Sequence, residues 1–230
     1  MFQFRHFTIR QNRCAMKVGT DGVLLGAWAE LPERGRVLDI GTGTGLLALM
    51  AAQRSPDCRV TAVEVDATAA EQARENVAAS PWAHNINIIC TDVRHFQGDE
   101  RYDCILSNPP YYDGTLLPPD AARATARHTD ALSYEELAVS VSRLLAPEGT
   151  FSVVLPTENT ERLITACAAR NLYLEALTDV STTASKPPRR TLLRFSRRNT
   201  RTATNHLLLM EKDGKRSVEY AKLTEVFYIK

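Results

Sequence analysis

Short apolar runs alternate with helix-like segments through most of the chain. Runs of strand length and apolar character occupy residues 36–40, 59–66, 86–90, 102–106 and 151–155. Alanine-rich or leucine-rich segments with helical composition lie between or after them, at 46–52, 67–79, 134–145 and 160–170. Strands that alternate with helices at this spacing predict an α/β fold with a doubly wound, mostly parallel sheet.

The end of the chain departs from this alternation. Two more strands are expected at 172–180 and 206–211, which brings the predicted sheet to seven strands. No helix is expected in the basic stretch that joins them, so they should form an antiparallel hairpin at one edge. We therefore expect one domain over 1–230, with an amino-terminal flanking element (1–34), a core (35–156) and a carboxyl-terminal helix with edge strands (157–230).

Composition favours a globular protein of the cytoplasm. The chain has 230 residues, 44% of them hydrophobic and 24% charged, which suits one substantial core. The first 13 residues alternate polar and apolar positions, unlike a signal peptide, and no later run reaches membrane-spanning length. The five cysteines contain no CxxC pair. We expect reduced core thiols and no metal.

The net charge of +1 conceals an uneven distribution. Residues 1–20 hold four basic residues and no acid, residues 180–210 hold seven and no acid, and the remaining sequence is acidic. This asymmetry is typical of a protein that binds a polyanion with one face, although solvated surface segments would look the same. The candidate RNA-binding residues are Arg5, Arg10, Arg13, Lys17, Lys186, Arg189, Arg190, Arg197 and Arg198.

A glycine turn follows the first predicted strand. Gly41, Gly43 and Gly45 let the backbone turn tightly before a helix whose free N–H groups can face an anion. Glu64 follows Gly45 by 19 residues and ends the second strand, where a carboxylate can accept hydrogen bonds from both hydroxyls of a ribose. Asp92, just past the third strand, is placed for an adenine edge, or for a simple turn or helix cap.

These residues together indicate a nucleoside cofactor. The GxGxG spacing differs from the GxGxxG typical of dinucleotide sites, so a nicotinamide or flavin cofactor is not favoured. S-adenosylmethionine fits better, because it has one ribose and an amino-acid end. Asp39 and the amides of the glycine turn could hold its ammonium and carboxylate groups.

The segment Ser107-Asn108-Pro109-Pro110-Tyr111 follows the fourth strand. The side-chain oxygen of Asn108 and the carbonyl of Pro109 can each accept one N–H of an exocyclic amine. The amine lone pair then points at the sulfonium methyl group. Pro109 and Pro110 stiffen the loop, and Tyr111 offers a stacking face. The alternative is a proline-terminated strand with a buried tyrosine.

These motifs resemble the class I, Rossmann-like, S-adenosylmethionine-dependent N-methyltransferases. VLDIGTGTG, VEVD, CTDV and SNPPY carry the resemblance over about 35–156. Over nearly its whole length the chain also resembles bacterial tRNA adenine-37 N6-methyltransferases that act on valine tRNA, through FRHFTIRQNRCAMKVGTDGVLLGAWA and KPPRRTLLRFSR. This resemblance implies an adenine target beside the anticodon and a loop at Thr20-Asp21 that closes over the cofactor. It implies neither a metal nor an obligate protein partner.

Other functions share parts of this pattern. NPPY also implies cytosine N4, guanine N2 or glutamine-amide methylation, but the glutamine enzymes carry a sizeable amino-terminal helical domain, and 38 residues precede Asp39 here. A DNA enzyme would need more chain for base readout, and a non-catalytic RNA-binding module would lack part of the motif set. Residues 113–133, with Arg127-His128, are either a lid over the target base or an ordinary surface loop.

Overall fold

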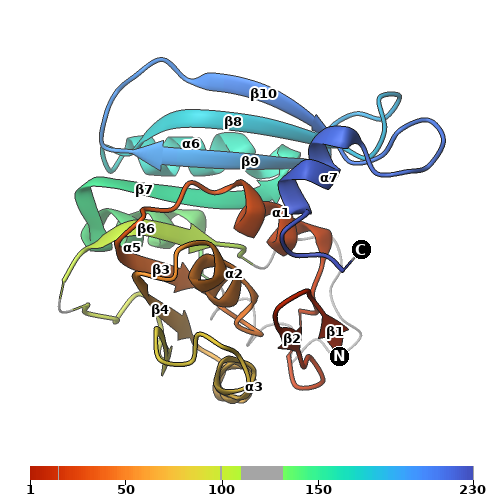
Figure 1. The fold of residues 1–230 in the computed structure, drawn as a ribbon. Helices are drawn as coiled ribbons and strands as arrows, with labels where there is room; N and C mark the ends of the chain where they lie inside the picture. Colours follow the sequence, from red (N-terminus) through yellow and green to blue (C-terminus); the bar gives the residue numbers. More distant parts are fainter. Residues whose placement is uncertain (15, 99, 110–131, 230) are drawn as a thin grey trace, which may run out of the picture.

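The computed structural model of the protein describes residues 1–14, 16–98, 100–109 and 132–229. Its centre is an eight-stranded sheet in the order β10-β8-β9-β7-β6-β3-β4-β5 (Figure 1). The strands are β3 (Gly35–Ile40), β4 (Cys58–Glu64), β5 (Ile86–Cys90), β6 (Tyr102–Ser107), β7 (Leu145–Pro156), β8 (Tyr173–Ser181), β9 (Arg190–Ser196) and β10 (Ala203–Leu208). The expected doubly wound α/β architecture is confirmed.

Helices cover both faces of this sheet. In Figure 1, α1, α2 and α7 lie in front of the sheet, and α5 and α6 lie behind it. The helices are α1 (Thr20–Trp28), α2 (Leu46–Arg54), α3 (Ala67–Ala78), α5 (Tyr134–Leu144), the short 3-10 helix η1 (Thr157–Asn159), α6 (Thr160–Ala168) and α7 (Val218–Thr224). Alternate strand residues enter different cores: Val37 packs with α1, α2 and α3, whereas Leu38 packs with α5 and α6.

The strand order reverses between β3 and β6. β3 pairs in parallel with β4 on one side and with β6 on the other, with Ile40 opposite Ser107. The glycine turn after Ile40 and Asn108 after Ser107 therefore leave neighbouring strands at the same edge. Ligands of open α/β sheets bind at such a switch point, beyond the carboxyl ends of the strands.

The carboxyl-terminal part of the sheet differs from the expectation of seven strands. β9 lies inside the basic segment and pairs antiparallel with both β7 and β8, so the sheet has eight strands. β10 pairs in parallel with β8 at the edge, which means that the expected antiparallel edge hairpin is wrong. β9 was missed because its arginines obscured an apolar core: Leu192, Leu193 and Phe195 are fully buried.

β7 is also longer than expected. The strand was expected at 151–155, yet β7 begins at Leu145 and runs through Pro147-Glu148-Gly149. The pairing with β6 jumps from Tyr102 opposite Leu145 to Cys104 opposite Thr150. Such a bulge accommodates the extra residues of β7 without ending the strand.

The amino-terminal region forms a separate hairpin, with β1 (Phe2–Gln3) antiparallel to β2 (Thr8–Ile9). The Arg5 amide donates to the Phe227 carbonyl at 2.8 Å, and Phe4 stacks with Tyr228. The two ends of the chain thus pack together, as Figure 1 shows.

The cysteine expectation holds in part. All five thiols are free, and Cys58, Cys104 and Cys167 are buried. Cys14 is only half-buried and Cys90 is exposed, so neither is a core residue. No helix among the described residues is long and apolar enough to cross a membrane.

Candidate active site at the carboxyl edge of the sheet

The glycine turn adopts backbone conformations that require glycine. Gly41, Gly43 and Gly45 have φ values of 71°, 55° and 83°, all in the left-handed region. A Cβ atom at Gly43 would meet nothing within 4 Å, whereas one at Gly45 would lie 3.5 Å from the Cβ of Ala73. There is room for a side chain at both positions, so it is the backbone conformation of the turn that requires glycine.

Glu64 is held in place by the turn that it faces. Its Oε2 accepts a hydrogen bond from the Gly43 amide at 2.8 Å, and its Oε1 accepts from the Asp66 amide at 3.0 Å. Each carboxylate oxygen keeps a lone pair for a further donor. The arrangement fixes the carboxylate at the end of β4, as the predicted ribose contact requires.

Asp39 is a fully buried carboxyl beneath the glycine turn. Its Oδ2 accepts from the Thr42 hydroxyl at 2.5 Å and from the Ala48 amide at 3.2 Å. Its Oδ1 is buried and has no hydrogen-bond partner among the described residues. Burial raises the pKa of Asp39 to about 7, against the two hydrogen bonds, which lower it. An ammonium group beside Oδ1 would satisfy this oxygen, so the residues fit the amino-acid end of S-adenosylmethionine.

The carboxylate of Asp92 makes more hydrogen bonds within the protein than the sequence suggested. Oδ1 accepts from the Arg94 amide and Oδ2 from the Arg94 guanidinium, both at 2.8 Å. Arg94 also reaches Glu136 on α5 at 3.1 Å. The hydrogen bond from the Arg94 side chain lowers the pKa of Asp92. The turn geometry considered as an alternative is present, and the adenine contact stays a prediction.

Asn108 begins the segment that follows β6. The Ser107 hydroxyl donates to the Ile40 carbonyl at 3.0 Å, which ties the ends of β6 and β3 together. Asn108 is half-buried, and its Nδ2 lies 3.8 Å from the Met16 sulfur. Pro109 is buried. The proposed partners Pro110 and Tyr111 lie outside the described residues, as do Arg127 and His128 and most of the segment considered as a lid.

Thr20 and Asp21 open α1 beside Asn108. A Cβ atom at Gly22 would lie 2.9 Å from a methyl carbon of Leu46 and 3.6 Å from Asn108 Nδ2, so the first turn of α1 passes close to Asn108. Asp21 forms an ion pair with Arg190 at 2.7 Å. A predicted cofactor residue and a predicted RNA residue therefore contact each other, and the pair joins α1 to β9.

The amino-terminal strap, defined as residues 10–14 and 16–18, crosses this edge of the sheet. Asn76 on α3 accepts from the Arg10 amide at 2.8 Å and donates to the Arg10 carbonyl at 2.9 Å. It also donates to the Thr44 carbonyl in the glycine turn at 2.8 Å. Gln72 accepts from the Arg13 amide at 3.3 Å. Two buried amides thus join the strap to the site.

The strap passes close to the predicted ribose residue. Burial raises the pKa of the Cys14 thiol, and the nearby carboxylates of Glu64 and Asp66 raise it further. Gln72 and Asn76 were missed in the sequence, although their spacing places them on the same helical face as Ala69, Ala73 and Val77. Two amides in an apolar stripe are a signal that could have revealed this contact.

The predicted RNA-binding residues divide between opposite edges of the sheet. β9 runs antiparallel to β7, with Arg190 opposite Pro156 and Ser196 opposite Thr150. Lys186, Arg189 and Arg190 therefore lie at the carboxyl edge. Arg197 and Arg198 lie at the other edge, where Arg197 donates to the Ser142 carbonyl and Arg198 pairs with Glu175. The interpretation that the basic residues gather on one face is therefore wrong for Arg197 and Arg198.

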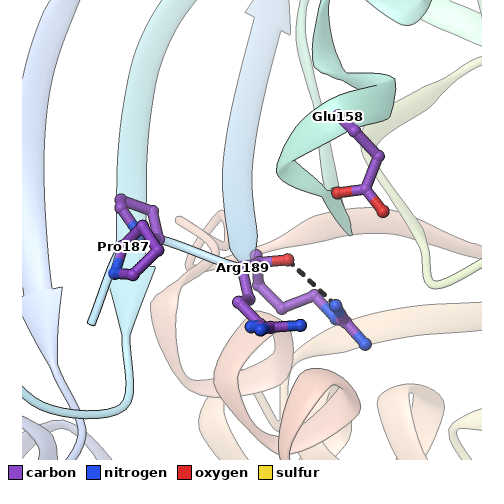
Figure 2. A pocket seen from close by; sticks show the side chains of 5 residues that line it. Glu158, Pro187 and Arg189 are labelled. Carbon is purple, nitrogen blue, oxygen red and sulfur yellow. Dashed lines mark hydrogen bonds between the residues drawn. The ribbon is translucent and has the colours of Figure 1, made fainter.

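The amino-terminal basic residues lie on or near the strap. Arg5, Arg10 and Lys17 are exposed, and Arg13 forms an ion pair with Glu75 on α3. A pocket of about 220 Å³ lies at the carboxyl edge, lined by Glu158, Pro187, Pro188, Arg189 and Arg190 (Figure 2).

Comparison with known proteins agrees with this geometry. The methyltransferase small domain family model matches residues 17–160. The chain is 46% identical to a tRNA1(Val) (adenine(37)-N6)-methyltransferase of Bacteroides thetaiotaomicron, over 99% of this chain and 97% of that protein. A solved structure of a predicted O-methyltransferase from Agrobacterium tumefaciens matches with a TM-score of 0.69 and 18% identity, over 90% of this chain and 96% of that one.

A glycopeptide N-methyltransferase solved in complex with S-adenosylmethionine matches with a TM-score of 0.56 and 16% identity. The match covers 80% of this chain and 90% of that one. At these identities the two solved structures show a shared fold.

Proposed function

The chain belongs to the methyltransferase small domain family, and from that premise we propose that it methylates N6 of an adenine in tRNA, at position 37 of a valine tRNA. It is an S-adenosylmethionine-dependent methyltransferase. The observation that carries the proposal is the adjacency of Asn108 and the glycine turn, which follow neighbouring parallel strands. The near full-length similarity to a tRNA1(Val) (adenine(37)-N6)-methyltransferase supports the choice of substrate.

The chemistry rests on positioning. The cofactor supplies an electrophilic methyl group bound to a positively charged sulfur. The side-chain oxygen of Asn108 and the carbonyl of Pro109 each accept one N–H of the adenine amine. The nitrogen lone pair then faces the methyl carbon. The bound cofactor would supply this methyl group to the nitrogen, and the electrons of the S–C bond would remain on its sulfur. The extra proton leaves the nitrogen for solvent, so no side-chain base is required.

The remaining contacts concern cofactor binding. Glu64 would accept hydrogen bonds from the ribose hydroxyls, and Asp39 would face the ammonium group across its unpartnered Oδ1. The amides of the glycine turn would face the carboxylate group of the cofactor's amino-acid end. Asp21, already paired with Arg190, would position α1 beside this end of the site.

Two further assignments belong to the proposal. We treat residues 157–230 as part of the same domain as the core, which is supported by the pairing of β9 with β7. We also assign the protein to the cytoplasm, where tRNA is modified, without an obligate protein partner.

Labelled S-adenosylmethionine tests the proposal directly. The purified protein is incubated with separate tRNA, rRNA, DNA and protein fractions, and the modified product is identified by mass spectrometry. We expect N6-methyladenine in tRNA, greatly reduced with Asn108→Ala. Methylglutamine, or methylated guanine alone, would refute the adenine assignment while leaving the cofactor chemistry intact.

A further inference from the structure

The pocket in Figure 2 lies at the carboxyl edge of the sheet, and one of its lining residues, Arg190, is paired with Asp21 of α1. Arg190 contacts Asp21, and the next residue of α1, Gly22, approaches Asn108. The pocket and Asn108 therefore lie on two sides of the first turn of one helix, which is about 10 Å across. Neighbouring nucleotides of a splayed RNA loop can span such a distance.

The backbone of the pocket is fixed to the sheet at two points. The Arg189 amide donates to the Val180 carbonyl at 3.1 Å, and the Arg189 carbonyl accepts from the Thr157 amide at 3.3 Å. Proline at 187 and 188 fixes the backbone that leads into β9. The backbone that carries Arg189 is thus held in place without a ligand, which lowers the entropic cost of binding.

The two adjacent arginines have different environments. Arg190 donates to Asp21 at 2.7 Å and to the Arg189 carbonyl at 2.9 Å. Arg189 is exposed, and its guanidinium makes no hydrogen bond or ion pair with any residue that the structure describes. In Figure 2, Arg189 lies between Pro187 and the carboxylate of Glu158. Arg190 is a structural tie, and Arg189 is available for an anion.

We infer that this pocket binds the sugar-phosphate of a ribonucleotide next to the methylated adenine, with Arg189 on the phosphate and Glu158 on the ribose 2′-hydroxyl. The inference rests on the proposed function. About 220 Å³ is below the roughly 300–1,000 Å³ of small-molecule sites, so the pocket suits one part of a larger molecule. A carboxylate would weaken a site for phosphate alone.

The three surfaces of the pocket match one nucleotide. A guanidinium binds phosphate through charge-assisted hydrogen bonds, and a carboxylate accepts from a hydroxyl. The rings of Pro187 and Pro188 offer an apolar wall for the sugar carbons. Because DNA lacks the 2′-hydroxyl, Glu158 would also make the pocket selective for RNA.

Arg189→Ala tests the phosphate contact, with Arg201→Ala as the matched control. Arg201 is an exposed arginine of the loop at the opposite edge of the sheet. We expect Arg189→Ala to raise KM for tRNA about 10-fold, the effect of losing one charge-assisted hydrogen bond. The slope of log binding against log salt should fall by about 0.7. The kcat at saturating tRNA and the affinity for S-adenosylmethionine should match those of the parent.

Single 2′-deoxy substitutions test the ribose contact. Each RNA hairpin contains the target adenine and one deoxynucleotide. The deoxynucleotide is placed in turn at the first or second position on the 5′ side of the adenine and at the first or second position on its 3′ side. In the parent protein one substitution should raise KM roughly fivefold. In Glu158→Ala the same substitution should not raise KM further, because the protein variant and the deoxy substitution remove the same interaction. Both side chains are exposed, and a thermal melt verifies that the variants remain folded.

The outcomes separate the two proposals. If Arg189→Ala matches Arg201→Ala in KM and salt slope, the phosphate contact is refuted. If every deoxy substitution that raises KM in the parent raises it equally in Glu158→Ala, the ribose contact is refuted. In either case normal N6-methyladenine formation by the parent leaves the proposed function standing. A parent that methylates no RNA would refute both.

Discussion

Asp39→Asn tests the charge of the buried carboxyl beneath the glycine turn. In the unfolded chain this carboxyl has its ordinary pKa of 3.8, and in the folded protein burial raises the pKa to about 7. Between these values the folded state binds a proton that the unfolded state has lost. The contribution of this carboxyl to the free energy of unfolding therefore falls as the pH rises from about 4 to about 7, and is constant above that range. A shift of this size corresponds to about 4 kcal/mol.

The asparagine variant removes this titration and keeps the geometry. Its side-chain oxygen can still accept from the Thr42 hydroxyl and the Ala48 amide. Urea unfolding at pH 5 and pH 8 gives the change in the free energy of unfolding between these pH values, for the parent and for the variant. Comparing the two changes removes the contribution of the other titrating groups, which both proteins share. About two pH units of this range lie between pH 5 and the folded pKa, so we expect the variant to lose less stability between these pH values than the parent, by about 3 kcal/mol. Asp57→Asn, at an exposed carboxylate, should behave like the parent.

Cofactor binding gives a second measure of the same group. An ammonium beside Oδ1 would favour the ionised carboxylate, so S-adenosylmethionine should release a proton when it binds near pH 7. Calorimetry in two buffers with different ionisation enthalpies counts that proton. The parent should release it, and Asp39→Asn should bind more weakly without release. An identical pH dependence of stability in parent and variant, together with binding that releases no proton, would refute the reasoning.

Three further predictions concern the other contacts of the site. Asn108→Ala should lower kcat on the order of 100-fold while calorimetry shows nearly unchanged cofactor affinity, and a variant with parental turnover would contradict the positioning role. Asn76→Ala should lower the free energy of unfolding by about 2 kcal/mol, because it leaves the Arg10 and Thr44 backbone groups without a partner, and should expose the strap to proteolysis; an unchanged urea midpoint would contradict this. Glu64→Gln should weaken binding of both S-adenosylmethionine and its demethylated product about 10-fold by calorimetry, since one amide oxygen cannot replace two carboxylate oxygens, and equal affinity would exclude a ribose contact.

Three of the candidate site residues share one edge of the sheet, as the ends of the predicted strands indicated. Asp39, Glu64 and Asn108 each lie at or just beyond a short buried strand, and the parallel sheet brings these strand ends to one edge. The inference works because it depends only on local periodicity and on a general property of parallel sheets. It does not require knowledge of which strands are neighbours.

Features that depend on contacts between distant residues were not predicted from the sequence. β9 has both faces buried, so its apolar residues form a short run that Arg194 interrupts, and Arg194 itself pairs with Glu30 and Glu175. α1 is apolar on nearly all sides and lacks helical periodicity. The division of the arginines between two edges follows from the antiparallel direction of β9, which no local pattern encodes.

The packing of the amino-terminal hairpin on Phe227 and Tyr228 has a consequence for the order of events during synthesis. The ribosome releases the chain from its amino end, so residues 1–9 emerge more than 200 residues before the partners on which they pack. The sheet from β3 to β7 can assemble in the meantime. The hairpin that leads into the strap reaches its native packing only after Phe227 and Tyr228 have left the exit tunnel, so this part of the protein is completed later than the sheet that carries the site.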